Sequence, residues 1–255
     1  MTTGALRCEG VTKRYGDTLA VDRLDLTVPT GSLFGLVGPN GAGKTTTLSM
    51  ATGLLRPDSG RVVVAGTDVW ADVQRAHRVL GVLPDGLALL DRLTGPELVE
   101  YTGRLHGLPR AEAAFRAAEL LDVLDLADAG RTLVVDYSAG MRKKVGLACA
   151  LVHAPRVLVL DEPFEAVDPV SGTTIRALLR RFTADGGTVV VSSHVMALVE
   201  QLCDSVAVIV AGRVVAAGTL HEVRGDGSLE ERFVELSGGS RGLGEGLSWL
   251  ASSSG

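Results

Sequence analysis

Residues 33–48 read LFGLVGPNGAGKTTTL, an apolar run followed by a glycine-rich turn and a threonine-rich segment. The apolar run at 33–37 predicts a buried strand, and the residues from Lys44 onward predict a helix that ends near Gly53. The turn between them has the spacing G-x-x-x-x-G-K-[ST] of a phosphate-binding loop. Because the loop follows a strand and opens a helix, it predicts a nucleoside triphosphate site in an α/β core.

The residue types of this loop suit phosphate chemistry. Glycines let successive backbone N–H groups turn inward around phosphate oxygens, and the helix N-terminus adds the positive end of its dipole. Lys44 is expected to reach the terminal phosphates, the Thr45 hydroxyl to ligate Mg²⁺, and Thr46 to donate near the α-phosphate. The loop therefore predicts these nucleotide-binding residues: Gly38, Pro39, Asn40, Gly41, Ala42, Gly43, Lys44, Thr45 and Thr46. Kinases, GTPases, helicases and transport ATPases share such a loop, so other motifs must decide the function.

Short apolar runs alternate with helical patterns along the rest of the chain. The runs at 157–160, 188–191 and 206–210 predict further strands, as does 79–83, and 61–69 predicts an edge hairpin. Strands separated by helical segments predict a parallel sheet with crossover helices.

Residues 85–136 differ from this alternation because they are rich in Ala, Leu, Glu and Arg at helical spacing. Thr94 and Glu97 form a capping-box pair, which predicts a helix ending at Gly107, and a second helix is expected from Pro109 to about residue 126. We interpret this segment as a helical subdomain inserted into the core.

The predicted domain boundaries follow from this insertion. An ATPase domain is expected at 1–225, with its core at 1–84 and 137–225 and the helical subdomain between. Residues 226–255 are expected to hold a C-terminal helix and a Gly/Ser-rich tail, whose large apolar residues include Trp249 and Leu250.

Composition excludes several classes of protein. The 255 residues are 46% hydrophobic and 22% charged, which is the opposite of a disordered chain. A net charge of −5 argues against a general electrostatic grip on nucleic acid. The three cysteines are far apart and are expected to be reduced. The first ten residues lack a secretory pattern, and no apolar run approaches the about 20 residues of a membrane span, so the chain is not expected to cross a membrane by itself.

Two carboxylates follow the apolar run at 157–160. Asp161 is expected at the carboxyl edge of the sheet beside the phosphate loop, where it can hold Mg²⁺ through water. Glu162 can face an attacking water as a general base or orienting group. His194 follows the run at 188–191 and can hydrogen-bond the γ-phosphate and the water. A guanine-reading Asn-Lys-x-Asp motif is absent from the sequence, which argues against a GTPase.

These motifs resemble those of the ATP-binding subunit of ABC transporters over about residues 6–225. Tyr15 matches the aromatic residue that stacks on adenine in that family. Residues 137–141, YSAGM, look like the family signature, in which Ser138, the Gly140 backbone and a helix N-terminus face the γ-phosphate bound to the other subunit. Asp168 resembles a residue of the loop that crosses the dimer interface, and His194 matches the switch histidine. The resemblance implies a P-loop NTPase core with a parallel sheet flanked by helices, an N-terminal antiparallel β-subdomain and the inserted helical subdomain.

Four positions depart from the usual family pattern. Asp85 stands where the family has a Gln that contacts Mg²⁺, and we expect its carboxylate still to bind the metal. The signature has Ala139 and Met141 in place of Gly and Gln, a variant similar to a subgroup of exporter ATPases with separate permeases. Glu165 replaces the interface Ser. The basic residues 142–144 either add positive potential at the signature or form a solvated helix face.

The resemblance implies an ATPase that uses ATP and Mg²⁺ and powers export through a separate integral membrane permease. Its expected partners are a second ATPase subunit, identical or related, and that permease, but no nucleic acid. The expected location is cytoplasmic, on the inner face of the cell membrane. Glu162, His194 and Lys44 are the expected catalytic residues, and Thr45, Asp85 and Asp161 the expected metal ligands.

Two alternatives belong to other functional classes. A non-transport ABC ATPase acting on ribosomes or DNA usually has two ATPase units, a coiled coil or a zinc insertion, none of which is evident in this sequence. A regulatory module that binds ATP without hydrolysing it would be favoured by loss of Glu162, which is present. The cargo cannot be inferred from this chain.

Overall fold

Two β-sheets form the frame of the structure, a computed structural model that describes residues 4–86 and 88–237. The smaller sheet is antiparallel, with the strand order β2-β1-β4-β5. Its strands span Gly4–Tyr15 (β1), Thr18–Pro29 (β2), Ser59–Val64 (β4) and Thr67–Asp68 (β5). The expected antiparallel β-subdomain and the hairpin at 61–69 are therefore present.

The larger sheet has the strand order β10-β9-β3-β8-β7-β6, and all its neighbours are parallel except the β9–β10 pair. All five residues of β3 are buried, as are all of β7 and β8. Parallel strands covered on both faces are expected to be continuously apolar, which explains the unbroken apolar runs in the sequence. The strands span Leu33–Val37 (β3), Leu80–Leu83 (β6), Val157–Asp161 (β7), Thr188–Ser193 (β8), Ser205–Val210 (β9) and Arg213–Thr219 (β10).

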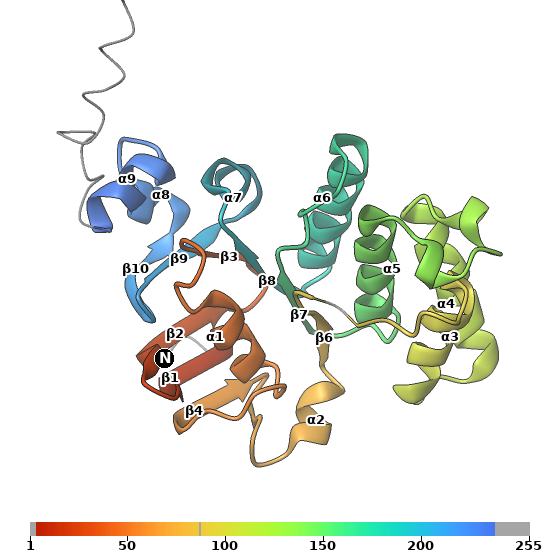
Figure 1. Cartoon of the computed structure of the whole chain (residues 1–255), viewed down its shortest axis with the longest axis horizontal. Coiled ribbons are helices and arrows are strands. Elements are labelled where there is room, and N and C mark those ends of the chain that lie inside the picture. The colour runs from red at the N-terminus through yellow and green to blue at the C-terminus, as the bar shows by residue number, and fades with distance from the viewer. Residues whose placement is uncertain (1–3, 87, 238–255) are drawn as a thin grey trace, which may run out of the picture.

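Helices cover the larger sheet and extend beyond its β6 edge (Figure 1). The expected capping box is present, because Thr94 Oγ1 accepts from Glu97 N–H and the Glu97 carboxylate accepts from Thr94 N–H. The second helix ends three residues earlier than predicted, at Val123, where the chain turns through Asp125 with φ 55°. The helices span Lys44–Ala51 (α1), Val73–His77 (α2), Gly95–Leu105 (α3), Arg110–Val123 (α4), Ala139–Leu151 (α5), Pro169–Ala184 (α6), Met196–Leu202 (α7), Leu220–Arg224 (α8) and Leu229–Leu236 (α9), with 3₁₀ turns at Ala127–Ala129 (η1) and Val134–Asp136 (η2).

Strand β3 joins two hydrophobic cores because its successive side chains point to opposite faces. Leu33 and Val37 pack in the core shared with α3 to α7, whereas Phe34 and Leu36 pack in the core between the two sheets and α1. The phosphate loop is thus attached to a strand whose five residues are all buried.

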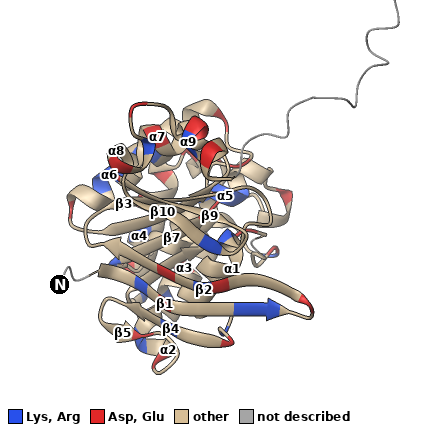
Figure 2. Ribbon diagram, turned by 90° about the vertical axis from the view of Figure 1, so that its left-hand side faces the viewer, with Lys and Arg blue, Asp and Glu red and all other residues tan. Residues whose placement is uncertain are grey.

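Charge and cysteine chemistry agree with the expectations from composition. Acidic and basic residues are interspersed over the described part of the chain (Figure 2).

The three cysteines are free, and burial raises the pKa of the Cys8 and Cys203 thiols to about 12, so both are inert thiols at neutral pH. Among residues 4–86 and 88–237, none of the helices is long and apolar enough to cross a membrane. Trp249 and Leu250 lie outside the described residues.

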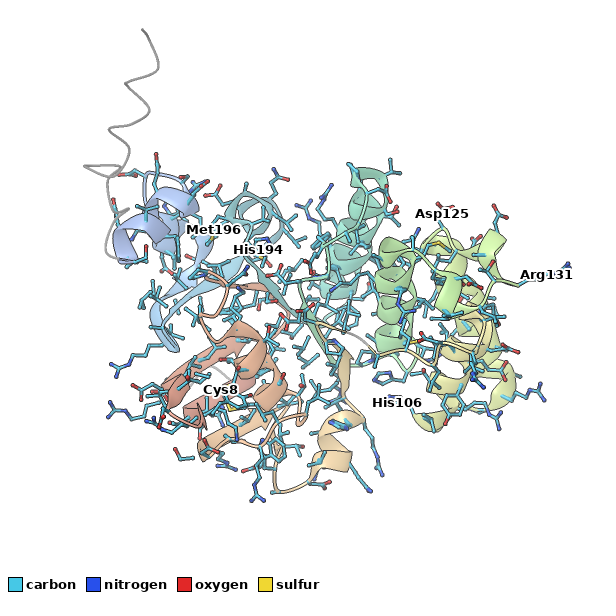
Figure 3. All side chains as sticks on the ribbon, in the orientation of Figure 1. Cys8, His106, Asp125, Arg131, His194 and Met196 are labelled. Carbon is cyan, nitrogen blue, oxygen red and sulfur yellow. The ribbon has the colours of Figure 1, made fainter. Side chains whose placement is uncertain are left out.

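A stacked histidine pair joins the helical segment to the sheet. The rings of His106, at the end of α3, and His153, after α5, lie 3.7 Å apart and nearly parallel. Figure 3 labels His106. His153 Nε2 donates to the Leu80 carbonyl at 2.9 Å, and within the described chain its buried Nδ1 has no hydrogen-bond partner. Burial, with His106 and Arg116 nearby, lowers the pKa of His153 from 6.5 to about 4.

This lowered pKa predicts a loss of stability in mild acid. Below pH 6.5 the unfolded chain binds a proton at His153, whereas the folded chain binds it only near pH 4. The free energy of unfolding should therefore fall as the pH is lowered from 6.5 to about 4. Because the ring is not fully buried, we expect a loss of about 1–2 kcal/mol. Urea unfolding at pH 7, 6, 5 and 4 should show a flatter profile for His153→Gln than for the wild type. The exposed His221, changed to Gln, is the control and should leave the profile unchanged.

Candidate active site

The parallel register brings the predicted site segments to one edge of the larger sheet. Val37, which precedes the phosphate loop, pairs with Ser193, and Ser192 pairs with Asp161. The loop after β3, the carboxylates after β7 and the histidine after β8 therefore meet where these three strands end. Ligands of open α/β sheets bind at this carboxyl edge.

The backbone of the phosphate loop adopts conformations that require glycine. Gly41 and Gly43 have φ values of 79° and 102°. A Cβ on Gly43 would lie 2.5 Å from the Ala20 carbonyl oxygen, and one on Gly38 would lie 2.3 Å from that of Ile209. A Cβ on Gly41 would meet nothing within 4 Å, so this glycine borders open space. The loop is thus a close-packed cradle with one open side, and it fits a phosphate group.

Lys44 lies folded into this cradle. Its side chain is 7% exposed, and its Nζ donates to the Gly38 and Pro39 carbonyls at 2.8 and 3.2 Å. Burial lowers the pKa of Lys44, while Glu162 and Asp161 act in the opposite direction. The ammonium is therefore held by weak loop acceptors at a position where a polyphosphate would be a stronger partner.

Ser192 joins the two carboxylate residues and was not assigned a role from sequence. Its Oγ donates a short hydrogen bond to Asp161 Oδ1 and accepts from the Glu162 N–H at 3.0 Å. Glu162 has φ 47°, a strained conformation for a residue with a side chain, and this hydrogen bond helps to hold it. A serine directly after the apolar run 189–191, two residues before His194, was the signal that could have revealed it.

Replacing Ser192 by Ala is expected to lower both stability and turnover. The change leaves the buried Asp161 carboxylate and the Glu162 amide without this partner, which should cost about 1–3 kcal/mol of folding free energy. We expect kcat to fall about tenfold, since a small displacement of a base weakens proton transfer. Thermal unfolding and an ATPase assay test this. Ser193→Ala, whose Oγ accepts from Val195 N–H outside the carboxylate pair, is the control.

Glu162 is positioned from two further sides. Its Oε1 lies 3.0 Å from His194 Nδ1 and 3.9 Å from Lys44 Nζ. The carboxylate is 14% exposed, whereas His194 is 46% exposed and lies beside Met196 at the start of α7 (Figure 3). A half-buried carboxylate hydrogen-bonded to an accessible imidazole can accept a proton from a water at this edge.

The predicted adenine and signature residues lie on other elements. Tyr15 ends β1, is 51% exposed, and has Lys13 Nζ 5.9 Å from its ring centroid. Ser138 is the N-cap of α5, and its Oγ accepts from Met141 N–H at 3.2 Å. Ala139 is the first residue of α5, so the signature forms a helix N-terminus, where the first backbone N–H groups have no partner within the helix.

The basic residues of the signature helix have partners within the chain. Arg142 Nη1 donates to Asp91 Oδ1 and to the Val134 carbonyl, both at 2.9 Å. Lys144 is buried and donates to the Asp125 carbonyl and to Ser171 Oγ. Lys143 Nζ donates to the Asp161 carbonyl at 3.3 Å and lies 3.8 Å from Asp85 Oδ1. The interpretation of these residues as a solvated face was wrong, and each of them joins separate segments of the chain.

Asp168 caps α6 in this chain. Its carboxylate accepts from Val170 N–H and Ser171 N–H, both at 3.0 Å, and hydrogen bonding to Ser171 is the main cause that lowers the pKa of Asp168. Glu165 and Val170 beside it are exposed, and Val170 is 78% exposed. The segment predicted to cross a dimer interface is thus an accessible loop.

The fold and the site together define a P-loop ATPase. A family model described as ABC transporter matches residues 21–165, and the chain belongs to this family. It is 42% identical over 226 residues to the daunorubicin resistance ATP-binding protein DrrA3 of Streptomyces coeruleorubidus, covering 89% of this chain and 72% of that protein. It is 36% identical to the linearmycin resistance ATP-binding protein LnrL of Bacillus subtilis (strain 168), covering 84% and 69%. A Nod factor export ATP-binding protein I of Ralstonia nicotianae is 39% identical, with 87% and 69% covered.

Solved structures agree with this assignment. A structure described as the ATP binding subunit of an ABC transporter superposes with a TM-score of 0.85 at 29% identity, covering 91% of this chain and 99% of the other. The dimeric ABC transporter cassette MJ0796 gives a TM-score of 0.78 at 25% identity, covering 84% and 98%. The chain is therefore an ATP-binding and ATP-hydrolysing subunit of an ABC transporter.

Proposed function

We propose that this subunit powers export through a separate membrane permease, and that it works as a dimer at the inner face of the membrane. The observation that carries the proposal is the joint placement of Lys44, Asp161, Glu162 and His194 at one sheet edge, linked by direct contacts. The names of the relatives, which refer to resistance and to export, support the direction of transport.

In this proposal each ATP lies between two subunits. The phosphates occupy the loop that runs from Gly38 to Thr46, with the adenine against Tyr15. The exposed helix N-terminus at Ser138 and Gly140 of a second subunit binds the γ-phosphate from the other side. The exposed loop around Val170 meets the partner, which is supported by the dimeric form of the structurally similar cassette. The second subunit is either identical or a close relative.

The residues of this chain divide the chemistry among them. Lys44 leaves the Gly38 and Pro39 carbonyls for the terminal phosphates, where its charge offsets the charge that develops on transfer. Glu162 orients the water and accepts its proton. The single N–H of a neutral His194 either holds the carboxylate through Nδ1 or, when it is on Nε2, donates to the γ-phosphate. When bound, Mg²⁺ would neutralise phosphate charge, and Thr45, Asp161 and Asp85 offer the oxygen ligands that it prefers.

We further propose that residues 85–136 act as the helical subdomain on which the permease docks, with the core at 1–84 and 137–225. Relatives of similar identity have names that refer to daunorubicin, linearmycin and Nod factor. Cargo choice would therefore be a property of the permease.

Affinity purification of the tagged Glu162→Gln variant with ATP and Mg²⁺ from detergent-solubilised membranes tests the proposal. The substitution should slow hydrolysis and hold the closed dimer, so a multispanning membrane protein should co-purify with it. Recovery of ribosomes or DNA-repair proteins without a membrane protein would instead support a non-transport ABC ATPase. The wild-type chain with ADP is the control.

A further inference from the structure

Lys143 connects three segments of the site that are far apart in sequence. It lies in the second turn of α5, two residues after the signature, and its side chain is 15% exposed. Its Nζ contacts the Asp161 carbonyl at the end of β7 and the Asp85 carboxylate just after β6. The ammonium therefore bridges the strand end that carries the catalytic carboxylates and the linker that leads into α3.

Arg142 repeats this arrangement one residue earlier. It pairs with Asp91 of the same linker and with the Val134 carbonyl before the signature. Two consecutive cations of α5 thus hold two acidic residues of the β6–α3 linker. The two ion pairs differ in their acidic partner: Asp85 is a proposed metal ligand, whereas Asp91 is not.

Asp85 has competing partners if the proposed function is right. The Lys143–Asp85 distance of 3.8 Å is long for a hydrogen-bonded ion pair, and the carboxylate is 48% exposed, so a divalent cation can displace the ammonium at modest cost. A neutral Gln, which the family usually has at this position, would form no ion pair with Lys143. The charge of Asp85 therefore makes the contact with α5 dependent on the metal.

We propose that Lys143 and Asp85 form an electrostatic latch, and that Mg²⁺ with ATP opens it by taking the Asp85 carboxylate from Lys143. The inference rests on the proposed metal role of Asp85. In the nucleotide-free subunit the latch ties the linker to the second turn of the signature helix. Binding of the metal and nucleotide releases that tie, so occupancy of the site changes how α5 is joined to the linker. Lys143 is a positioning residue in this scheme.

A double-mutant cycle on nucleotide binding tests the latch without relying on turnover. The four proteins are Glu162→Gln alone and with Lys143→Met, Asp85→Asn or both, and the probe is a fluorescent ATP analogue titrated with Mg²⁺. Lys143→Met should lower the Mg²⁺ concentration for half-maximal binding by about two- to fivefold, because the carboxylate loses its competitor. Asp85→Asn should raise that concentration, and Lys143→Met should have no further effect in the Asp85→Asn background.

The controls separate the latch from general charge effects. Arg142→Met removes the adjacent cation of the same helix. It should change the Mg²⁺ concentration for half-maximal binding equally in the Asp85 and Asp85→Asn backgrounds. With EDTA in place of Mg²⁺, Lys143→Met should leave probe affinity unchanged. An equal shift by Lys143→Met in both backgrounds would show simple repulsion of the metal and overturn the latch. No effect of Asp85→Asn on the Mg²⁺ titration would overturn the latch together with the metal role of Asp85, whereas failure of every variant to bind the probe would overturn the nucleotide site itself.

Discussion

Replacing Glu162 by Gln is expected to lower the steady-state ATPase rate by about 10²- to 10⁴-fold, the usual contribution of a positioned general base. The amide keeps nearly the shape of the carboxylate but cannot accept the proton of the attacking water. It also loses the negative charge that lies 3.9 Å from Lys44 Nζ and 3.0 Å from His194 Nδ1. Phosphate release in single-turnover and steady-state assays measures the effect.

Binding should survive this substitution. The phosphate loop and Lys44 remain, so the affinity for ATP should be unchanged within a few fold, and the ATP-bound dimer should accumulate on size-exclusion chromatography. Glu230→Gln is the matched control, because it removes an exposed carboxylate of α9, outside the site and the proposed interface, and should retain wild-type turnover. Equal ATPase rates for Glu162→Gln and wild type would contradict the assignment of the base.

Replacing Lys44 by Met should abolish useful nucleotide affinity. Removing one partner of a buried charge-assisted contact costs about 2–5 kcal/mol, so the dissociation constant for ATP should rise by about 30- to 5000-fold. Turnover should be lost with it, since no other cation of the loop can reach the terminal phosphates. Equilibrium binding of a fluorescent ATP analogue measures the change.

Stability separates this effect from misfolding. Burial lowers the pKa of Lys44, which means that the ammonium is held at a cost when no phosphate is present. Met of similar length should therefore leave the melting temperature of the nucleotide-free protein unchanged or slightly higher. Arg56→Met, which removes an exposed cation shortly after α1, should bind ATP normally. A Lys44→Met protein that binds ATP like the wild type would refute the proposed role.

The predictions from sequence that held rest on interactions between residues close in the chain. The strand, loop and helix around Lys44 were predicted from the apolar run, the spacing of the glycines and the start of the helix. All of these signals lie within residues 33–53. The start of α3 follows from the Thr94–Glu97 capping box for the same reason. Strands β1, β2 and β10 and the short helix α2 were not delimited, because their burial depends on distant pairing or, for α2, on a single turn.

Part of the candidate site could also be predicted from local sequence. Each motif could be recognised from residues close together in the chain. The apolar runs before Asp161 and His194 placed both residues at strand ends. Their meeting with Lys44 followed from the general rule that parallel strands end at one edge. The contacts among them did not, because the 3.0 Å contact between Glu162 and His194 depends on the register of β7 against β8.

By itself the sequence determined the class of core, the phosphate loop and the identity of the chemical groups, because these depend on spacings along the chain. Only the tertiary structure decided that Ser192 joins Asp161 to Glu162, that His153 stacks on His106, and that Lys143 holds Asp85. These pairs are 30 to 58 residues apart in the chain or belong to different elements. Their partners are chosen by sheet register and helix packing, which bring side chains together by geometry that no local pattern encodes.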